Sequence, residues 1–289
     1  METVLQILFS GCAVGMIYAV IAFGYQLTFA TSQTLNFGQG EALAIGALFG
    51  LTLTSFMNYW VMIPVVLLFG ACYGLFVERV GVRPAMKLKS EGWIMSTIAI
   101  GIILKNEAEN IWGREDMRFP SPVSEQAFEV AGARVMPMEI LVVIGALGIM
   151  LAIEFFNRKS IYGKAVVATA VDRDAAGLMG VNTGMVISFS YALSCATAAL
   201  AGVLIAPLTL AGAGMGAALG LKAFAVAIIG GLTSGLGVIV GGLILGISET
   251  ATGFFFSTGY KDVPGLLLLL LVLSVKPAGL FGKTVIKKV

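Results

Sequence analysis

The segment SQTLNFGQGEAL, residues Ser32–Leu43, places three amides, one acid and two glycines between two long apolar runs. Apolar runs of about 20 residues are long enough to cross the hydrocarbon core of a bilayer as helices. The runs are continuous and do not alternate every second residue, which favours helices over a β-barrel. The segment therefore predicts a polar break between two membrane helices.

The composition of the whole chain indicates a membrane protein. Of the 289 residues, 58% are hydrophobic and 12% are charged, and the mean hydropathy is +0.96. A soluble domain is about 45–50% apolar and about 25% charged, so this chain has too few polar residues to cover a surface in water. We expect one all-α, polytopic membrane helix bundle over residues 1–289, with about 8–9 transmembrane segments and Gly-broken helices. The apolar segments are 4–30, 38–57, 60–78, 93–104, 138–156, 184–209, 221–233, 235–252 and 263–280.

Basic residues in the polar stretches predict the orientation of this bundle. Stretches 78–92 and 157–183 and the C-terminal tail are basic, whereas 105–139 holds four basic residues against seven acidic ones. Because basic loops stay in the cytoplasm, we expect an external N-terminus, an external loop at about 105–137 and a cytoplasmic C-terminus. No basic residue precedes the first apolar run, which is read as a retained helix. The basic side chains are Arg79, Arg83, Lys87, Lys89, Arg158, Lys159, Lys164, Arg173, Lys276, Lys283, Lys287 and Lys288.

Glycine spacing predicts how the helices pack and where they break. Among 37 glycines, five G-x-x-x-G spacings fall in apolar segments, where they allow helix backbones to approach closely. Two glycine-interrupted stretches, NFGQGEALAIGALFG and IGGLTSGLGVIVGGLILG, lie near opposite ends of the chain. Paired interruptions in transporters often mark backbone that lines a pathway. The candidate pathway residues are Asn36, Gln39, Gly40 and Glu41 in the first stretch and Gly230, Gly231, Ser234 and Gly235 in the second.

Ionisable residues in apolar segments are costly to bury, so each raises a functional hypothesis. Glu41 falls at the start of a predicted helix for which Asn36 or a nearby residue offers a cap, and the helix dipole favours a negative charge there. Glu41 is then either a pathway residue or a helix-cap acid at the membrane surface. The other expected pairs are Lys222–Glu249 and, at (i, i+4), Glu154–Arg158.

Enzyme chemistry finds little support in the sequence. The chain has no histidine, the commonest general base, and Cys12, Cys72 and Cys195 lie at unrelated spacings in apolar runs. The GKT motif at 282–284 lacks the glycine that a phosphate-binding loop needs five positions earlier, where Pro277 stands. We expect no catalytic residue, metal site, cofactor or nucleic-acid partner for this chain.

The stretch Tyr162–Gly184 predicts one short amphipathic cytoplasmic helix that ends at Gly180 and Asn182. Such a helix lies on the bilayer or docks into a groove of a partner protein, and its sequence does not separate these alternatives.

Four stretches together resemble one known family. LNFGQGEALAIGA (35–47) resembles the N-x-A-H-G-E signature of branched-chain amino-acid type ABC transporter permeases. LKAFAVAIIGGLTSGLGVIVGGLILGISE (221–249) and KPAGLFG (276–282) resemble the glycine-rich segment and the ending of that family. The cytoplasmic pattern of Gly163, Ala168, Asp172, Gly180 and Asn182 is also similar. The resemblance runs in order over nearly the whole chain, which looks like the shorter of the two permease types.

This resemblance implies a permease subunit of an importer in the cell inner membrane, with its N-terminus periplasmic. Such permeases form the translocation path with a second related permease. They work with two cytoplasmic ATPase subunits, which bind the ATP, and with a periplasmic solute-binding protein. The coupling region at about 157–183, with the residues Gly163, Ala168, Asp172, Gly180 and Asn182, would sit on an ATPase, and the acidic outer loop would face the binding protein.

Because of two departures from the family pattern, the resemblance does not determine which solute is transported. Gln39 stands where the family usually has histidine, after Gly38 in place of alanine, and Val167 stands near the place of an arginine. Family members import branched-chain amino acids, urea, short amides, and aromatic or other organic acids. Two other classes remain as alternatives: a stand-alone ion-coupled secondary transporter or channel with Glu41 as its ion site, and a membrane scaffold whose glycine faces only recruit partners.

Overall fold

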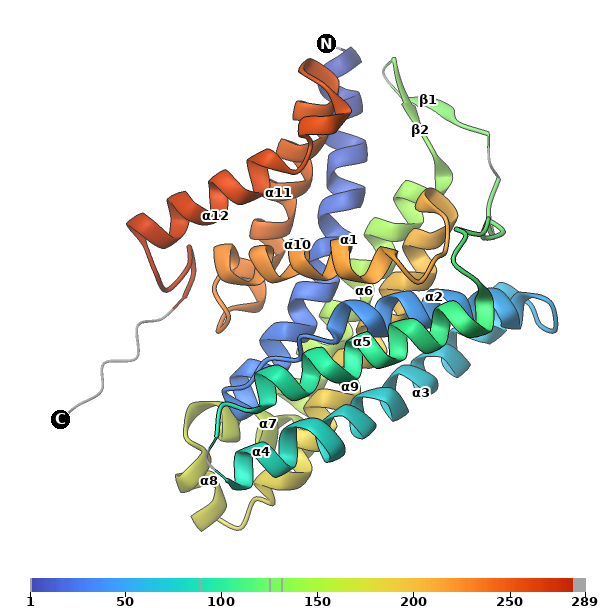
Figure 1. Ribbon diagram of the computed structural model, residues 1–289. Helices are drawn as coiled ribbons and strands as arrows, with labels where there is room; N and C mark the ends of the chain where they lie inside the picture. Colours follow the sequence, from blue (N-terminus) through green and yellow to red (C-terminus); the bar gives the residue numbers. More distant parts are fainter. Residues whose placement is uncertain (1, 89, 125, 131, 283–289) are drawn as a thin grey trace.

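A computed structural model of the chain describes residues 2–88, 90–124, 126–130 and 132–282 (Figure 1). Four of the basic residues used for the orientation, Lys89, Lys283, Lys287 and Lys288, lie outside the described residues, as do two residues of the GKT motif. The predicted all-α class is confirmed, because one short antiparallel hairpin, β1 (Phe128–Val130) and β2 (Ala133–Val135), is the only sheet among the described residues.

Each of the nine predicted apolar segments coincides with a helix. These helices are α1 (Glu2–Ser32), α2 (Gln39–Thr54), α3 (Tyr59–Val77), α5 (Trp93–Trp112), α6 (Pro137–Lys159), α9 (Thr183–Thr209), α10 (Met215–Gly230), α11 (Gly235–Phe255) and α12 (Val263–Val275). A π-helical turn, Glu78–Val82, continues α3 into the short helix α4 (Arg83–Lys87). Two further helices, α7 (Ile161–Val171) and α8 (Arg173–Leu178), occupy the predicted coupling region.

Six helices of the described chain are long and apolar enough to cross a membrane. They are α1, α3 with its extension to Lys87, α6, α9, α11, and α12 with the turn before it. Helices α2 and α10 have 16 residues each, which is about 24 Å and shorter than a bilayer core of about 30 Å. Helix α5 continues beyond the apolar segment because Lys105 and Glu109, one turn apart and 3.8 Å from each other, support it.

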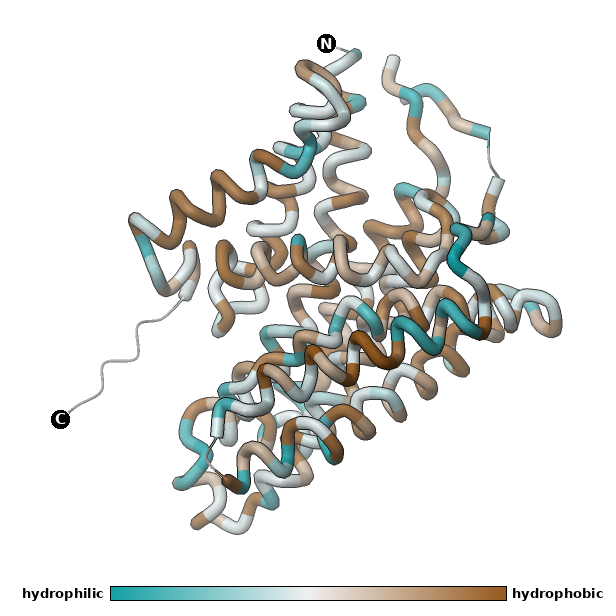
Figure 2. Tube along the Cα trace, viewed as in Figure 1, coloured by the Kyte–Doolittle hydropathy of each residue, from teal (hydrophilic) through white to brown (hydrophobic). Residues whose placement is uncertain are grey.

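The core of the bundle lies along α1 and α9, whose residues are mostly buried. Helix α10 runs across α1 rather than along it, whereas α2, α3, α5 and α9 run roughly side by side (Figure 1). Apolar residues follow the whole length of α12, and hydrophilic residues gather in the connections at the ends of the bundle (Figure 2). This distribution is the one that a lipid-facing surface requires.

Close helix contacts at the G-x-x-x-G pairs confirm the packing prediction. Gly11 and Gly15 of α1 face Gly242 and Gly246 of α11, and a methyl group on Gly15 would lie 2.5 Å from the carbonyl oxygen of Gly242. No side chain fits at that distance, so two glycine faces allow the backbones to touch. The pairs Gly46/Gly50 and Gly70/Gly74 pack on α9, and Gly237/Gly241 packs on α10.

The prediction of one amphipathic helix over Tyr162–Gly184 is wrong. Asp172 ends α7 and starts α8, because its Oδ1 accepts a hydrogen bond of 2.9 Å from the amide of Ala175. Aspartate prefers this N-cap position to the interior of a helix. Gly180 has a positive φ of 89°, and Asn182 caps the start of α9 through the amide of Met185 at 3.1 Å.

Candidate functional site

The predicted break at residues 33–38 reverses the chain inside the bundle. Helix α1 ends at Ser32, and α2 starts at Gln39, beside Gly24 of α1 and Ser194 of α9. The N-cap of α2 is Gly38, which has no side chain to cap the helix. Asn36 is therefore not the cap: its Oδ1 accepts the amide of Gly38 at 3.0 Å and closes a local turn.

Gln39 links three helices through neutral hydrogen bonds. Its side chain is completely buried, and its Nε2 donates to the carbonyl oxygen of Ser194 at 2.9 Å. The hydroxyl of Ser194 lies 2.9 Å from the Gln39 Oε1 and 2.8 Å from the carbonyl oxygen of Gly24. Both ends of the amide thus have partners, as buried polar groups require. This residue holds α1, α2 and α9 together.

Asn36 also points into the core of the bundle. It is completely buried, and its Nδ2 donates to the Sγ of Cys195 at 3.3 Å. Beside it, the hydroxyl of Thr34 lies 2.7 Å from that of Tyr191. The polar residues of the break are therefore anchored on α9, and their role in the fold is to fix the turn.

Glu41 lies on another face of the same helix turn. It sits in the first turn of α2, as predicted, where the helix dipole favours its charge. Added methyl groups on Gly101 of α5 and Gly216 of α10 would lie 3.3 Å from its Cγ and 3.0 Å from its Oε2. Within the described part of the chain, this buried Oε2 has no hydrogen-bond partner. The arrangement leaves a carboxylate oxygen among glycines, free to accept from a small cationic or N–H group.

The second predicted break lies between α10 and α11. Gly231 has a positive φ of 100°, and the hydroxyl of Ser234 caps α11 by accepting the amide of Gly237 at 3.1 Å. The segment that follows α12 packs against this break, because the amide of Leu280 donates to the carbonyl oxygen of Ile229 at 2.8 Å. Gly230 packs directly on Gly237, and Gly235 lies beside Phe23 of α1.

The two breaks lie at the same level of α1 but do not form one cluster. Gly24 contacts Gln39, and its neighbour Phe23 contacts Gly235. Helix α10 begins near Gly40 and ends at the second break, so about 24 Å of helix separates the two breaks. The transverse α10 therefore connects the two interruptions that the sequence analysis singled out.

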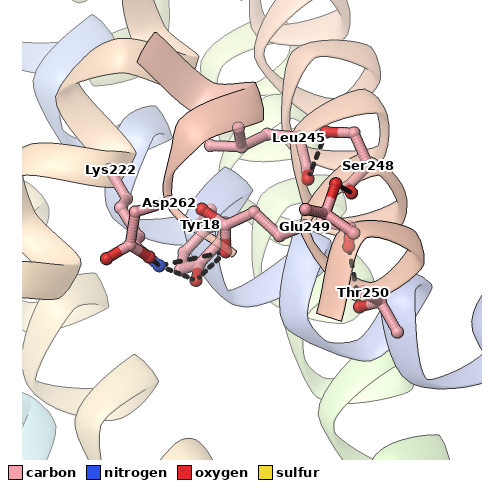
Figure 3. Close-up of polar contacts among 9 residues, drawn as sticks. Tyr18, Lys222, Leu245, Ser248, Glu249, Thr250 and Asp262 are labelled. Atoms are coloured by element: carbon pink, nitrogen blue, oxygen red, sulfur yellow. Dashed lines mark hydrogen bonds and ion pairs between the residues drawn. The ribbon is translucent and has the colours of Figure 1, made fainter. Parts of the chain in front are cut away.

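A charged network joins α10 to three neighbouring elements (Figure 3). The predicted pair is confirmed: the Nζ of Lys222 lies 3.0 Å from the Oε2 of Glu249, which also accepts the hydroxyl of Tyr18 at 2.8 Å. Asp262, just before α12, adds a second contact to Lys222 at 2.6 Å. Tyr18 and Asp262 could not be predicted as members of this network, because no local sequence pattern indicates partners so distant in the chain. The pair Glu154–Arg158 is also confirmed, at 2.7 Å.

The predicted coupling residues take different roles in the structure. Gly163 is buried against the backbone of Phe156 and Asn157, whereas Ala168 is exposed. Asp172, Gly180 and Asn182 shape the turns around α8. Three large apolar side chains near these turns, Val171, Leu178 and Met179, are more than 80% exposed. Exposed apolar residues in a polar connection indicate a surface that binds another protein or the membrane.

Comparison with known proteins assigns the family. The sequence profile of the family described as the branched-chain amino acid transport system / permease component matches residues 7–273. The chain is 34% identical to the high-affinity branched-chain amino acid transport system permease protein LivH of Escherichia coli K12, over 99% of this chain and 97% of that protein. It is 31% identical to the corresponding permease protein BraD of Pseudomonas aeruginosa, over 99% and 98%.

The similarity extends to an archaeal permease protein. The probable permease protein LivH of Methanocaldococcus jannaschii is 27% identical, over 91% of this chain and 88% of that protein. No solved structure matches the chain significantly. The curated relatives are transport permease proteins, which agrees with the prediction that this chain is not an enzyme. By its sequence over nearly its full length, the chain is a member of the branched-chain amino acid transport permease family.

Proposed function

We propose that this chain is the transmembrane permease subunit of an ATP-driven importer for branched-chain amino acids or related small polar or organic solutes. In this proposal it forms the translocation path with a second related permease in the cell inner membrane. Two cytoplasmic ATPase subunits bind and hydrolyse ATP, and a periplasmic binding protein delivers the solute. The chain itself carries no cofactor. Membership of the permease family supports this assignment.

The observation that carries the pathway proposal is the position of Glu41. Its carboxylate is part-buried between α2, α5 and α10, with glycine at the contacts and one oxygen without a partner in the described structure. An intramembrane acid with spare acceptor capacity is suited to a solute that carries an ammonium or amide N–H group. Gln39 serves this path indirectly, by fixing the turn from which Glu41 projects.

The topology proposal follows from the helix order. Helices α4, α7 and α8 gather at one end of the bundle, and the N-terminus and the β1–β2 hairpin lie at the other (Figure 1). We place the first end in the cytoplasm, because its connections are the basic ones. Helices α10 and α11 then enter and leave from the external side. Counted as two segments, they bring the total to nine, with a cytoplasmic C-terminus.

The ATPase partnership is tested by co-purification. We expect ATPase subunits to elute with the tagged full chain, and Leu178→Asp with Met179→Asp to remove them without lowering the yield of the permease. Arg158→Gln at the same end of the bundle should keep them. Uptake by this chain alone, driven by a proton gradient without any ATPase, would contradict the importer and support the secondary transporter.

The solute is tested on the binding protein. A thermal-shift screen of the partner binding protein against branched-chain amino acids, urea, short amides and aromatic acids identifies the ligand class. We expect stabilisation by a compound with an N–H donor, because the unpartnered oxygen of Glu41 is an acceptor. Stabilisation by carboxylic acids without an amino or amide group would contradict a role of Glu41 in solute contact.

A further inference from the structure

We propose that an anionic phospholipid binds between α4 and the start of α9, at the end of the bundle that carries α7 and α8. Two adjoining cavities of about 250 Å³ and 480 Å³ lie there and share Arg83 and Gly184 as lining residues. Arg79, Lys87 and Arg173 also line them. The site does not involve Glu41, but it adjoins the coupling region, because Arg173 and Asn182 are among its lining residues.

The charge of the cavities is positive. The one acid among the lining residues, Glu78, is 2% exposed and is held by a two-pronged ion pair with Arg83, at 2.9 and 3.2 Å. Arg83 also donates to the hydroxyl of Ser188 at 2.7 Å, which fixes its guanidinium on α9. Arg79, Lys87 and Arg173 are exposed and have no ion-pair partner among the described residues. Three uncompensated cations thus surround one cavity system and attract an anion.

The backbone supports the same conclusion. Glu78–Val82 is a π-helical turn, a rare conformation that is frequent at functional sites. On the opposite wall, Gly184 belongs to the first turn of α9, a helix of 27 residues whose N-terminus has a partial positive charge. The cations and the helix terminus therefore lie around the same space.

The depth of the site fits a lipid headgroup. Arg79 comes 20 residues after Tyr59 in the continuous helical run Tyr59–Lys87. Those 20 residues span about 30 Å, which is the thickness of a bilayer core. Exposed Trp60 marks the opposite membrane boundary, where tryptophan is common. The basic cavities therefore lie where the hydrocarbon meets the headgroups.

The lining itself is amphipathic. Beyond the arginines, the larger cavity is walled by Leu75, Met185, Phe189 and Ala192 of α3 and α9. Phe189 and Met185 are 39% and 65% exposed, which leaves an apolar surface for an acyl chain next to the cations. A phosphate group with attached acyl chains matches both parts, whereas a soluble phosphate matches only the basic part.

Native mass spectrometry of the delipidated full chain tests the proposal. We expect dioleoyl-phosphatidylglycerol to bind with at least tenfold higher affinity than dioleoyl-phosphatidylcholine. Arg79→Gln with Lys87→Gln should weaken phosphatidylglycerol binding by about 25-fold, because each cation near an anionic headgroup contributes about fivefold. The matched control, Arg158→Gln with Lys164→Gln, removes the same charge from the same end, at residues that line neither cavity.

Four outcomes decide the proposal. Equal binding of the two lipids, or equal losses in the test and control variants, would overturn it. Inorganic phosphate that competes fully with phosphatidylglycerol at equal concentration would also overturn it, in favour of a soluble anion. If the double variant does not fold, Arg79→Lys with Lys87→Arg should fold and keep lipid binding. Loss of lipid binding in that folded, charge-conserving variant would contradict a headgroup site.

Discussion

Two faces of the first turn of α2 differ in how their polar groups are satisfied. Gln39 faces α1 and α9, is completely buried, and has a partner at both ends of its amide. Glu41 faces α5 and α10 and keeps one buried oxygen without a partner in the described structure. Residues two positions apart point in different directions on a helix. One short motif therefore supplies both a structural link and an open acceptor.

On each face, the charge of the side chain suits the hydrogen-bond partners that are available there. A neutral amide with complete hydrogen bonding is stable in the low-dielectric core, and changing it disturbs the assembly of three helices. A carboxylate with spare capacity is costly there unless it contacts something that passes or binds. Substitutions on each of the two faces distinguish the structural role of Gln39 from the pathway role of Glu41. They follow in order of the expected loss of stability, the largest first.

The largest loss of stability is expected when the charged network of Lys222 is broken. This network holds α10, one of the two helices that Glu41 faces. Lys222→Met leaves Glu249 and Asp262 without their cation and should cost about 3–5 kcal/mol of folding free energy. Thermal unfolding in detergent measures this loss. Lys222→Met with Glu249→Gln should recover part of it, because one uncompensated charge is removed. An unchanged unfolding temperature in the single variant would mean that α10 does not depend on this network.

The next effect is expected for Gln39→Glu, on the closed face. The exchange keeps the shape, but it replaces the Nε2 donor by an oxygen facing the Ser194 carbonyl and buries an acid. We expect a loss of about 2–4 kcal/mol and poor assembly, measured by yield of monodisperse protein and by thermal unfolding. Gln39→His, which offers one donor and one acceptor, should be milder. Full stability of the glutamate variant would show that the link is not needed.

Two glycine-to-alanine substitutions, one on each face, test the difference between the Gln39 face and the Glu41 face. In Gly24→Ala the new methyl group would collide with the Gln39 side chain on the closed face, and we expect a loss of about 1–3 kcal/mol. In Gly101→Ala it would lie 3.3 Å from the Glu41 Cγ, so stability should change by less than about 1 kcal/mol. Uptake should instead fall severalfold, because space beside the carboxylate is reduced. The reverse pattern would exchange the roles of the two faces.

Part of this organisation could be predicted from the sequence. Apolar length and continuity located nine of the twelve α-helices of the described residues. Glycine spacing predicted close helix packing, which the contact of Gly15 with Gly242 confirms, but it did not indicate which glycines meet. The position of Glu41 in the first helical turn followed from the break before it. The pairing of Lys222 with Glu249 followed from the scarcity of charges in apolar segments.

The rest depends on packing between distant segments. The sequence assigned Gln39 and Glu41 to one pathway group, since neither periodicity nor composition tells which face of α2 meets α9. Tyr18 and Asp262 joined the charged network because α1 and the start of α12 approach α10 only in the folded bundle. Asp172 split the cytoplasmic helix because capping at an aspartate outweighed the apolar periodicity around it.

The most direct test of the account is Glu41→Gln, the reciprocal of the exchange at Gln39. The variant keeps shape and helix position, so we expect normal yield, normal ATPase co-elution and a change in stability below about 1 kcal/mol. Solute uptake by cells or proteoliposomes containing the complete importer should fall at least tenfold. Normal uptake with normal assembly would contradict the pathway role of Glu41 and leave it as an acid at a helix start.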